Sequence, residues 1–394
     1  MTTKRTWIFA LLAAALTVTL AGSNLVLGKG KPPKDDDPPD PPPLEFHLTL
    51  LPSHLGSELH ISRMNYWGDL VGRYYIGGVI DGDNVSTFVY LASTGMLYDL
   101  NDFVPADSDW FFESANDISD SGQIVGGGNI GTEGERHAYR FTPSDGTNPA
   151  IVEALSSLIP DHERSSAQAI NNNGELCMAA RNTDGLYVFL IVDAEGNIVH
   201  EMDLSGPHQL RDMNDSRQVA CRNMTDYYDF RYTPGSGEDT FPNPWGVPMG
   251  NRRLNNSGQV IGETAFRRSK GNKVFLAFGR HTDGIGIEDV GIEGGAYSSD
   301  GGGAINNCGD CASTDENYEG RYYLDSEEIT FTIRDAVTSA DSGDALERWQ
   351  NAPRIYVNDI NDRRQVCGYI TNPDGSKGDT FILTPSPLGS PCDE

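Results

Sequence analysis

The chain has 394 residues and a formal net charge of −28, from 57 acidic and 29 basic residues. So acidic a surface repels nucleic acid and anionic membranes, which excludes nucleic acid as a partner of the folded body. Solubility is the simplest interpretation of this charge, and an acidic site for a cationic partner is the alternative.

The first 23 residues have the pattern of a secretory signal. Lys4 and Arg5 precede an uncharged, mostly apolar stretch at 7–20, and small residues follow at 21–23. A retained membrane anchor is the alternative, but the stretch is short for a spanning helix of about 20 residues. We expect a chain that is secreted, periplasmic or on the cell surface, with no membrane span after cleavage.

Residues 24–43 form a predicted linker that includes the sequence KGKPPKDDDPPDPPP. Proline and charge in this density favour an extended, solvated segment over helix or sheet. We expect a folded body at 44–388 and a short C-terminal tail at 389–394.

A nine-residue phrase recurs seven times in this body. Each copy has an apolar residue (position 0), usually Asn (position 1), a turn, and an apolar pair at positions 6 and 7. The copies begin at Met64, Ile118, Ile170, Met213, Leu254, Ile305 and Ile360, 41 to 55 residues apart. A period near fifty predicts a repeat architecture.

The phrase favours a tight turn followed by a strand. Position 4 is Gly in five copies and Arg in two, Arg217 and Arg364, which favours a left-handed turn residue there. Positions 6 and 7 are apolar in every copy, so both faces of this strand are covered. Position 8 is mostly small, which predicts a close approach of backbones near a central axis.

Two further strands follow most phrases, the first of them containing an aromatic residue. The seventh repeat lacks the last strand, whereas an unassigned strand at 46–51 precedes the first repeat. If the strand at 46–51 fills the vacant place in the seventh repeat, the ring closes and leaves no exposed sheet edge between its first and last repeats. The sequence therefore predicts an all-β, seven-bladed β-propeller, closed by the N-terminal strand pairing with the last repeat.

The copies LNNSGQVIG from Leu254 and ISDSGQIVG from Ile118, the latter followed by His137-Ala138-Tyr139, resemble the bacterial extracellular HAF-repeat proteins. The resemblance covers nearly the whole chain after the linker. It implies a secreted, propeller-like fold and brings no activity and no catalytic residues.

Six cysteines in an exported chain predict disulfides. Cys177 is at position 7 of the third phrase, and Cys221 is at position 8 of the fourth. Neighbouring positions of a strand face opposite sides, so these two side chains of adjacent repeats could meet between blades. The remaining pairs would be Cys308 with Cys311, and Cys367 with Cys392. Redox exchange and half of a zinc site are alternative interpretations of the C-x-x-C sequence at 308–311.

Three short acidic motifs share the spacing Asp-x-(Ser/Asn)-Asp. Calcium binding is one interpretation, and side-chain turns are the simpler one. The motifs are Asp117-x-Ser119-Asp120, Asp212-x-Asn214-Asp215 and Asp359-x-Asn361-Asp362. The G-x-S-x-G, H-E-x-x-H and phosphate-loop signatures are missing from the sequence, so we assign no catalytic, cofactor-binding or metal residues; calcium is the one cofactor alternative.

Several aromatic residues lie in predicted loops, where they could face a glycan or protein ligand or pack between blades. They are Trp67, Trp110, Phe111, Tyr227, Trp245 and Trp349. We expect a non-enzymatic binding scaffold for a glycan or protein. The alternatives are a polysaccharide hydrolase or lyase, with two carboxylates about 5–10 Å apart at the channel mouth, and a structural or adhesive surface protein.

Overall fold

The computed structural model describes residues 42–52, 55, 59–76, 85–105, 108–131, 135–144, 147–159, 162–241, 250–267, 274–293, 303–387 and 392. The predicted signal, nearly all of the linker, and Trp245 lie outside these ranges. In the described ranges, no helix has the length and apolar character needed to cross a membrane.

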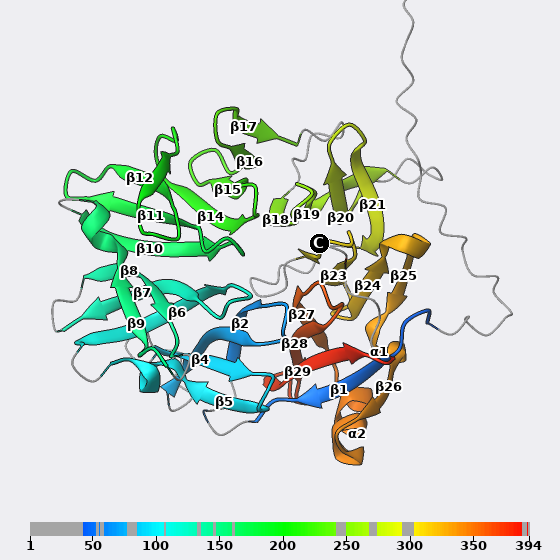
Figure 1. Cartoon of the computed structure of the whole chain (residues 1–394). Coiled ribbons are helices and arrows are strands. Elements are labelled where there is room, and N and C mark those ends of the chain that lie inside the picture. The colour runs from blue at the N-terminus through cyan, green and yellow to red at the C-terminus, as the bar shows by residue number, and fades with distance from the viewer. Residues whose placement is uncertain are drawn as a thin grey trace, which may run out of the picture.

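Seven small sheets, six of them antiparallel and the seventh with one parallel strand, stand around a common axis, which confirms the predicted propeller (Figure 1). The first blade contains β2 (Leu59–Met64), β3 (Leu70–Tyr75), β4 (Val85–Leu91) and β5 (Met96–Asp99). The second contains β6 (Trp110–Ile118), β7 (Ile124–Ile130), β8 (Arg136–Thr142) and β9 (Ile151–Ala154). The third contains β10 (His162–Ile170), β11 (Leu176–Asn182), β12 (Tyr187–Val192) and β13 (Ile198–Glu201).

The remaining blades follow in chain order around the ring. The fourth contains β14 (His208–Met213), β15 (Val219–Asn223), β16 (Asp229–Thr233) and β17 (Gly237–Thr240). The fifth contains β18 (Gly250–Leu254), β19 (Val260–Arg267), β20 (Val274–Thr282) and β21 (Gly286–Glu293). The sixth contains β22 (Ala304–Ile305), β23 (Cys311–Thr314), β24 (Gly320–Leu324) and β25 (Ile329–Thr332).

The seventh blade closes the ring and differs from the others. Its strands, from the axis outward, are β27 (Ile355–Ile360), β28 (Val366–Thr371), β29 (Lys377–Pro385), β1 (Phe46–Leu50) and β26 (Val337–Ala340). The predicted closure is confirmed, because β1 pairs antiparallel with β29. The parallel strand β26 on the outer edge of β1 was not predicted. In the described part of the chain, short helical segments connect strands: η2 (Leu100–Phe103), η3 (Leu155–Leu158), η4 (Asp325–Glu327), α1 (Ile333–Ala336) and α2 (Gly343–Asn351).

The repeat phrase turns out to be the hairpin between the first and second strands of each blade. Position 0 is the last residue of the innermost strand, and position 6 is the first residue of the second strand. Each of the first six blades therefore has four strands, one more than the sequence predicted. The apolar strand of positions 6 to 8, expected near the axis, is the second strand from it.

Backbone conformation explains the constant positions of the phrase. Position 4 has a positive φ in all seven turns, from 60° at Arg217 to 87° at Gly68. At position 8, a Cβ on Gly72 or Gly368 would lie 2.0 or 1.9 Å from a carbonyl oxygen of the innermost strand. The predicted close approach of backbones at position 8 is confirmed for these glycines.

Asparagine at position 1 joins six of the seven turns to the next blade; the second turn has Ser119 there. In the seventh turn, the Asn361 Oδ1 accepts a hydrogen bond from the Gln365 amide at 2.9 Å, while its Nδ2 donates to the Asn65 carbonyl at 2.9 Å. The equivalent bond to the next blade is also made by Asn65, Asn171, Asn214, Asn255 and Asn306. One residue type thus shapes the hairpin and braces the ring.

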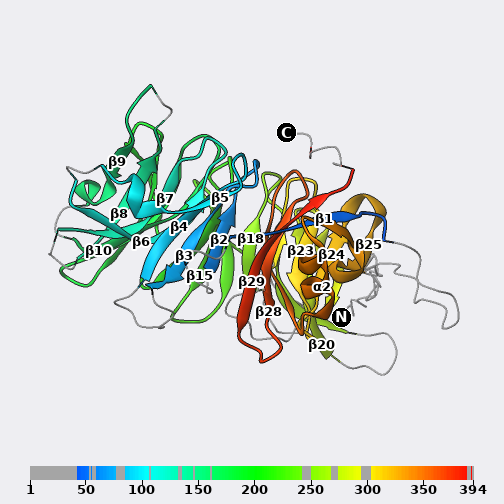
Figure 2. The same ribbon diagram turned by 90° about the horizontal axis from the view of Figure 1, so that it is seen from below.

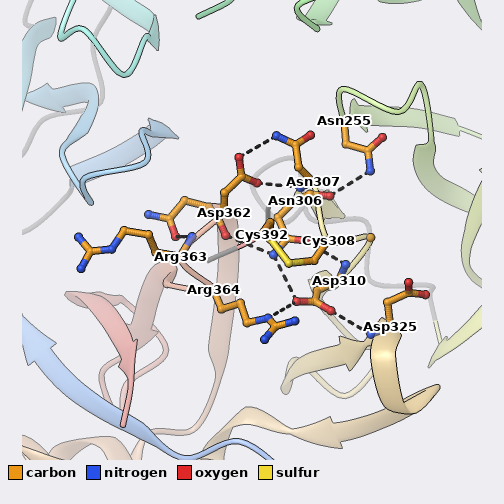
Figure 3. Close-up of a disulfide and its surroundings, with 12 residues drawn as sticks. Asn255, Asn306, Asn307, Cys308, Asp310, Asp325, Asp362, Arg363, Arg364 and Cys392 are labelled. Atoms are coloured by element: carbon orange, nitrogen blue, oxygen red, sulfur yellow. Dashed lines mark hydrogen bonds and ion pairs between the residues drawn. A yellow bond between two sulfur atoms is a disulfide. The ribbon is translucent and has the colours of Figure 1, made fainter. Parts of the chain in front are cut away.

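The disulfide pairing differs from the prediction. Cys308 is bonded to Cys392, 84 residues away, and the backbone N–H of Cys392 donates to the Asp362 carbonyl at 2.8 Å (Figure 3). Cys308 is in a turn, whereas Cys311 begins β23 and is buried between blades, so the two point to different places. The sequence alone did not show that the tail returns to this turn.

Four cysteines are free, buried thiols: Cys177, Cys221, Cys311 and Cys367. Cys177 and Cys221 do lie in one core cluster between the third and fourth blades, as the alternation of strand faces predicted, but they are not bonded. Burial raises the pKa of all four thiols, which makes them poor nucleophiles.

Candidate functional site

An ionic cluster crosses the central axis of the ring. Its members are the residues just before the repeat phrase, at position −1. Arg63 from β2 lies between Asp117 of β6, at 3.2 Å from Nε to Oδ1, and Asp212 of β14, with which it forms a close ion pair. Burial disfavours the charge on Arg63, but attraction by these aspartates and by Asp359 raises its pKa overall. Burial also raises the pKa of Asp117, to about 6, although Arg63 opposes this shift.

The same aspartates fasten neighbouring blades. A carboxylate oxygen of Asp117 accepts the Ile170 backbone N–H at 2.8 Å. Asp212 accepts that of Leu254 at 2.9 Å, and Asp359 that of Met64 at 2.9 Å. The first aspartate of each acidic motif is therefore a structural brace that ends in the axial ion cluster.

The last aspartate of each motif lies at position 2, around the mouth formed by the seven repeat turns. Asp120, Asp215 and Asp362 accept backbone N–H groups of neighbouring turns at 2.7, 2.9 and 2.7 Å. This turn-face mouth has a cavity of about 150 Å³. Among the described side chains, no group of three or more His, Cys, Asp or Glu is arranged to hold a metal ion. Hydrogen bonds between turns account for the spacing of all three motifs.

The opposite end of the axis is shaped by β-bulges. In six innermost strands the register shifts at position −2, so two residues oppose one on the neighbouring strand. A bulge re-aims a side chain, here toward the axis. The axis-lining residues at this position are Ser62, Asn116, Gln168, Arg211 and Asn358.

These bulges line the axial cavity, a space of about 340 Å³ at the end opposite the turn-face mouth. Three arginines line it: Arg73, Arg211 and Arg253. The other polar lining residues are His60, Ser62, Ser114, Asn116, Gln168, Gln209 and Asn358. Among the described residues that line this cavity there is no carboxylate, although the chain carries a net charge of −28.

Positive charge is concentrated at this end of the axis. Burial and the nearby Arg63 lower the pKa of Arg253, although Asp359, Asp212 and Asp117 oppose this shift, and its guanidinium donates to the Ser62 carbonyl at 3.2 Å. Arg136 donates to the hydroxyl of Ser114 in the cavity wall. Arg211 forms an ion pair behind the wall, with its Nε 3.7 Å from Asp229 Oδ1. Burial lowers the pKa of Arg136 too; Glu113 opposes this shift, whereas the like charges of Arg164 and Arg73 add to it. An anionic group would relieve this repulsion.

The predicted aromatic residues are divided between the two faces. Trp67 is 55% exposed on the turn face, and its Nε1 donates to the Asp120 carbonyl at 3.0 Å. Phe111 and Tyr227 are exposed on the face of the axial cavity, at strand ends remote from the repeat turns. Trp110 lies beside Phe111, half-buried against Tyr139.

Trp349 corrects the expectation of a ligand-facing aromatic. It is fully buried, because it anchors α2 on the seventh blade, with its ring centroid 5.0 Å from that of Phe381.

Sequence reasoning missed the three arginines and the bulged positions. One signal was present in the repeats themselves. Position −2 varies among Ser, Asn, Gln, Arg, Arg, Gly and Asn at 62, 116, 168, 211, 252, 303 and 358, while position 1 is nearly constant. A variable polar ring on a constant frame is typical of a recognition surface.

Comparison with protein-family models gave no match, and comparison with curated sequences gave none either. Among solved structures, the β-propeller domain of the Trilobed protease from Pyrococcus furiosus is similar, with a TM-score of 0.47 and 12% identity, over 83% of this chain and 94% of that one. An oligogalacturonate lyase in complex with manganese has a TM-score of 0.41 and 10% identity, over 89% and 98% of the two chains. The polysaccharide lyase Uly1 has a TM-score of 0.39 and 11% identity, over 93% and 95%.

Proposed function

We propose that the protein is a secreted, non-enzymatic binding scaffold that holds an anionic group of its ligand in the axial cavity. One observation carries this proposal. Three arginines, Arg73, Arg211 and Arg253, converge on one cavity with no carboxylate among its described lining residues, in a strongly acidic chain. The secretory-type N-terminus and the resemblance to extracellular HAF-repeat proteins support a location in the envelope or outside the cell.

The cavity is built on rigid elements, which favours binding. Its wall consists of innermost strands whose ends are tied by the position 1 asparagines and by Asp117, Asp212 and Asp359. Little ordering is needed when a ligand enters a preformed site, so more of the contact energy is available for affinity. Arginine holds carboxylate and sulfate groups through paired, charge-assisted hydrogen bonds.

The enzyme alternative needs two carboxylates that can exchange protons with a substrate. Asp117 and Asp212 are beside one another on Arg63 and line the turn-face mouth, but each is held by Arg63 and by a backbone N–H group of the next blade, and neither lines the axial cavity. This arrangement supports binding over hydrolysis by a carboxylate pair.

Calorimetric titration of the full chain with matched acidic and neutral glycans tests the proposal. We expect acidic glycans alone to bind. Because a charge-assisted hydrogen bond contributes about 1.5–3 kcal/mol, Arg211→Gln should weaken binding by about tenfold or more. Arg363→Gln is the matched control, since it removes the same charge at the turn face. Equal binding of neutral glycans, or equal effects of the two substitutions, would contradict the proposal.

A further inference from the structure

We infer that the ligand is an acidic oligosaccharide, with one sugar carboxylate in the axial cavity and neighbouring sugar rings on an aromatic rim outside it. The aromatic rim consists of Tyr187 and Tyr227, each next to an arginine. This inference rests on the proposed function and names the class of ligand for the same site.

The chemistry of the cavity wall selects among anions. An inorganic anion such as phosphate mainly accepts hydrogen bonds, so arginine and backbone N–H groups suffice to hold it. The wall also presents amides and hydroxyls, including Ser114, Asn116, Gln168 and Gln209. Such groups both donate and accept. A wall of this composition matches a ligand that combines a negative charge with several hydroxyl groups, as a sugar acid does.

In the fourth blade, the site continues from the cavity to the surface. Gln209 of the wall is opposite Arg222 across the pairing of β14 and β15. The guanidinium carbon of Arg222 lies 6.0 Å from the ring centroid of Tyr227, which is 66% exposed. Tyr227 also has a φ of 56°, a conformation that an aromatic residue rarely adopts.

The third blade repeats this arrangement. Gln168 lines the cavity, and further along the same strand Arg164 is opposite Arg181 on β11. The Arg181 guanidinium carbon lies 6.0 Å from the ring centroid of Tyr187, which is 37% exposed and stacks on Phe189. Arg181 also forms a half-exposed ion pair with Glu163, 3.6 Å from Nη1 to Oε2. Two adjacent blades thus offer an arginine beside an exposed aromatic face, which suits a chain of sugar rings that carry carboxylates.

The spacing sets a minimum ligand length. The rim residues follow the second strand of each blade, and neighbouring strands are about 4.8 Å apart. A ligand that fills the cavity and reaches the rim therefore has to span roughly 5–10 Å beyond the innermost strand. A single sugar ring is too short, so affinity should rise with the number of sugar units.

The test is calorimetric titration of the full chain with uronic-acid oligomers of one to four units. Their methyl esters, inorganic phosphate and short polyglutamate serve as comparison probes. The test variants are Tyr227→Ala and Tyr187→Ala, and Trp67→Ala is the matched control, because it removes an exposed aromatic from the opposite face. Thermal unfolding of each variant checks that it is folded.

We expect the parent protein to bind the trimer at least tenfold more tightly than the monomer. Tyr227→Ala and Tyr187→Ala should reduce this gain without changing the affinity for the monomer. Trp67→Ala should change neither affinity. Methyl esters should not bind. If phosphate, polyglutamate or the monomer binds as tightly as the oligomers, the inference is overturned while the proposed anionic site stands. If none of the acidic probes binds, or if Arg211→Gln changes nothing, both fail.

Discussion

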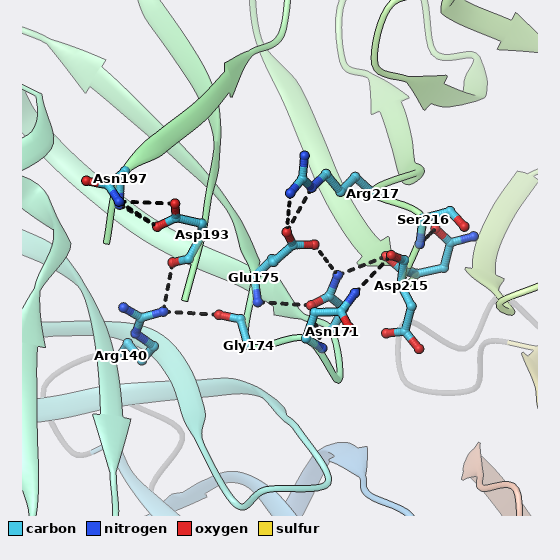
Figure 4. A network of polar contacts seen from close by, with 11 residues as sticks. Arg140, Asn171, Gly174, Glu175, Asp193, Asn197, Asp215, Ser216 and Arg217 are labelled. Atoms are coloured by element: carbon cyan, nitrogen blue, oxygen red, sulfur yellow. Dashed lines mark hydrogen bonds and ion pairs between the residues drawn. The ribbon is translucent and has the colours of Figure 1, made fainter. Parts of the chain in front are cut away.

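At the scale of single residues, the two departures from Gly at position 4 of the phrase have a common cause. A Cβ on Gly258 would lie 2.7 Å from the side-chain oxygen of Gln218, at position 5 of the preceding blade. Where position 4 is Arg217, the preceding blade instead has Glu175, whose Oε1 accepts the Arg217 Nε at 2.9 Å (Figure 4). Arg364 pairs with Asp310 in the same way, at 2.8 Å. A partner charge at position 5 thus accompanies an arginine at position 4.

Replacing Glu175 and Arg217 together tests this coupling. Glu175→Gln alone should cost about 0.5–1.5 kcal/mol at pH 7, since it removes an ion pair and leaves Arg217 at its φ of 60°. Glu175→Gln with Arg217→Gly recreates the Gln–Gly combination of other blades and should be within about 0.5 kcal/mol of the parent. Urea unfolding measures both. If the loss of stability in the double variant equals the sum of the losses in Glu175→Gln and Arg217→Gly measured singly, the coupling is refuted.

The pH dependence of this pair has a definite sign. The hydrogen bond from Arg217 is the main reason that the pKa of Glu175 is lowered in the folded protein. The folded state thus binds this proton less tightly than the unfolded state, whose pKa is about 4.3. The stabilisation is complete above that value and is lost as the pH falls through the folded pKa. The cost of Glu175→Gln should therefore shrink below about pH 4.

At the scale of elements, the spacing between the first two strands of the seventh blade depends on Gly368 at position 8. A Cβ on Gly368 would lie 1.9 Å from the Tyr356 carbonyl oxygen, a clash between backbones that a side-chain rotation cannot relieve. We predict that Gly368→Ala costs about 1–3 kcal/mol or more in urea unfolding.

The matched substitution is Gly343→Ala in α2, where a new Cβ meets nothing within 4 Å. Because alanine is the better helix former, this change should be neutral or stabilising by up to about 1 kcal/mol. If both substitutions had the same cost, crowding would not be the reason for the small residue at position 8.

At the scale of the whole molecule, stability depends on ring closure. Figure 2 shows β1 lying beside β29, although the two strands come from opposite ends of the chain. Leu48 of β1 is fully buried and is opposite Leu383. Leu48→Ala should cost about 2–5 kcal/mol, because it leaves a cavity in the closing blade.

Thr49→Ala is the control on the same strand, since Thr49 is only half-buried and should cost less than about 1 kcal/mol. Thermal unfolding compares the two variants. If Leu48→Ala were no more damaging than Thr49→Ala, β1 would not be the element that holds the ring closed.

The sequence by itself determined the ring: seven phrases, their left-handed turns, the crowded position 8 and the closing strand. Each of these follows from local backbone demands or from a repeat count, both of which can be read from residue types along the chain. The innermost strand was missed because its bulge breaks the alternation of apolar and polar residues, as in Ser114–Ile118.

Tertiary structure alone decided the rest. The bulges turn Gln168, Arg211 and Asn358 toward one axis, although they are far apart in the chain. Likewise, Cys308 meets Cys392 only because the fold places Cys392 beside Asp362 of the neighbouring repeat turn. Convergence of this kind depends on how seven separate blades are placed around an axis, and no local sequence pattern encodes which side chains then face one another.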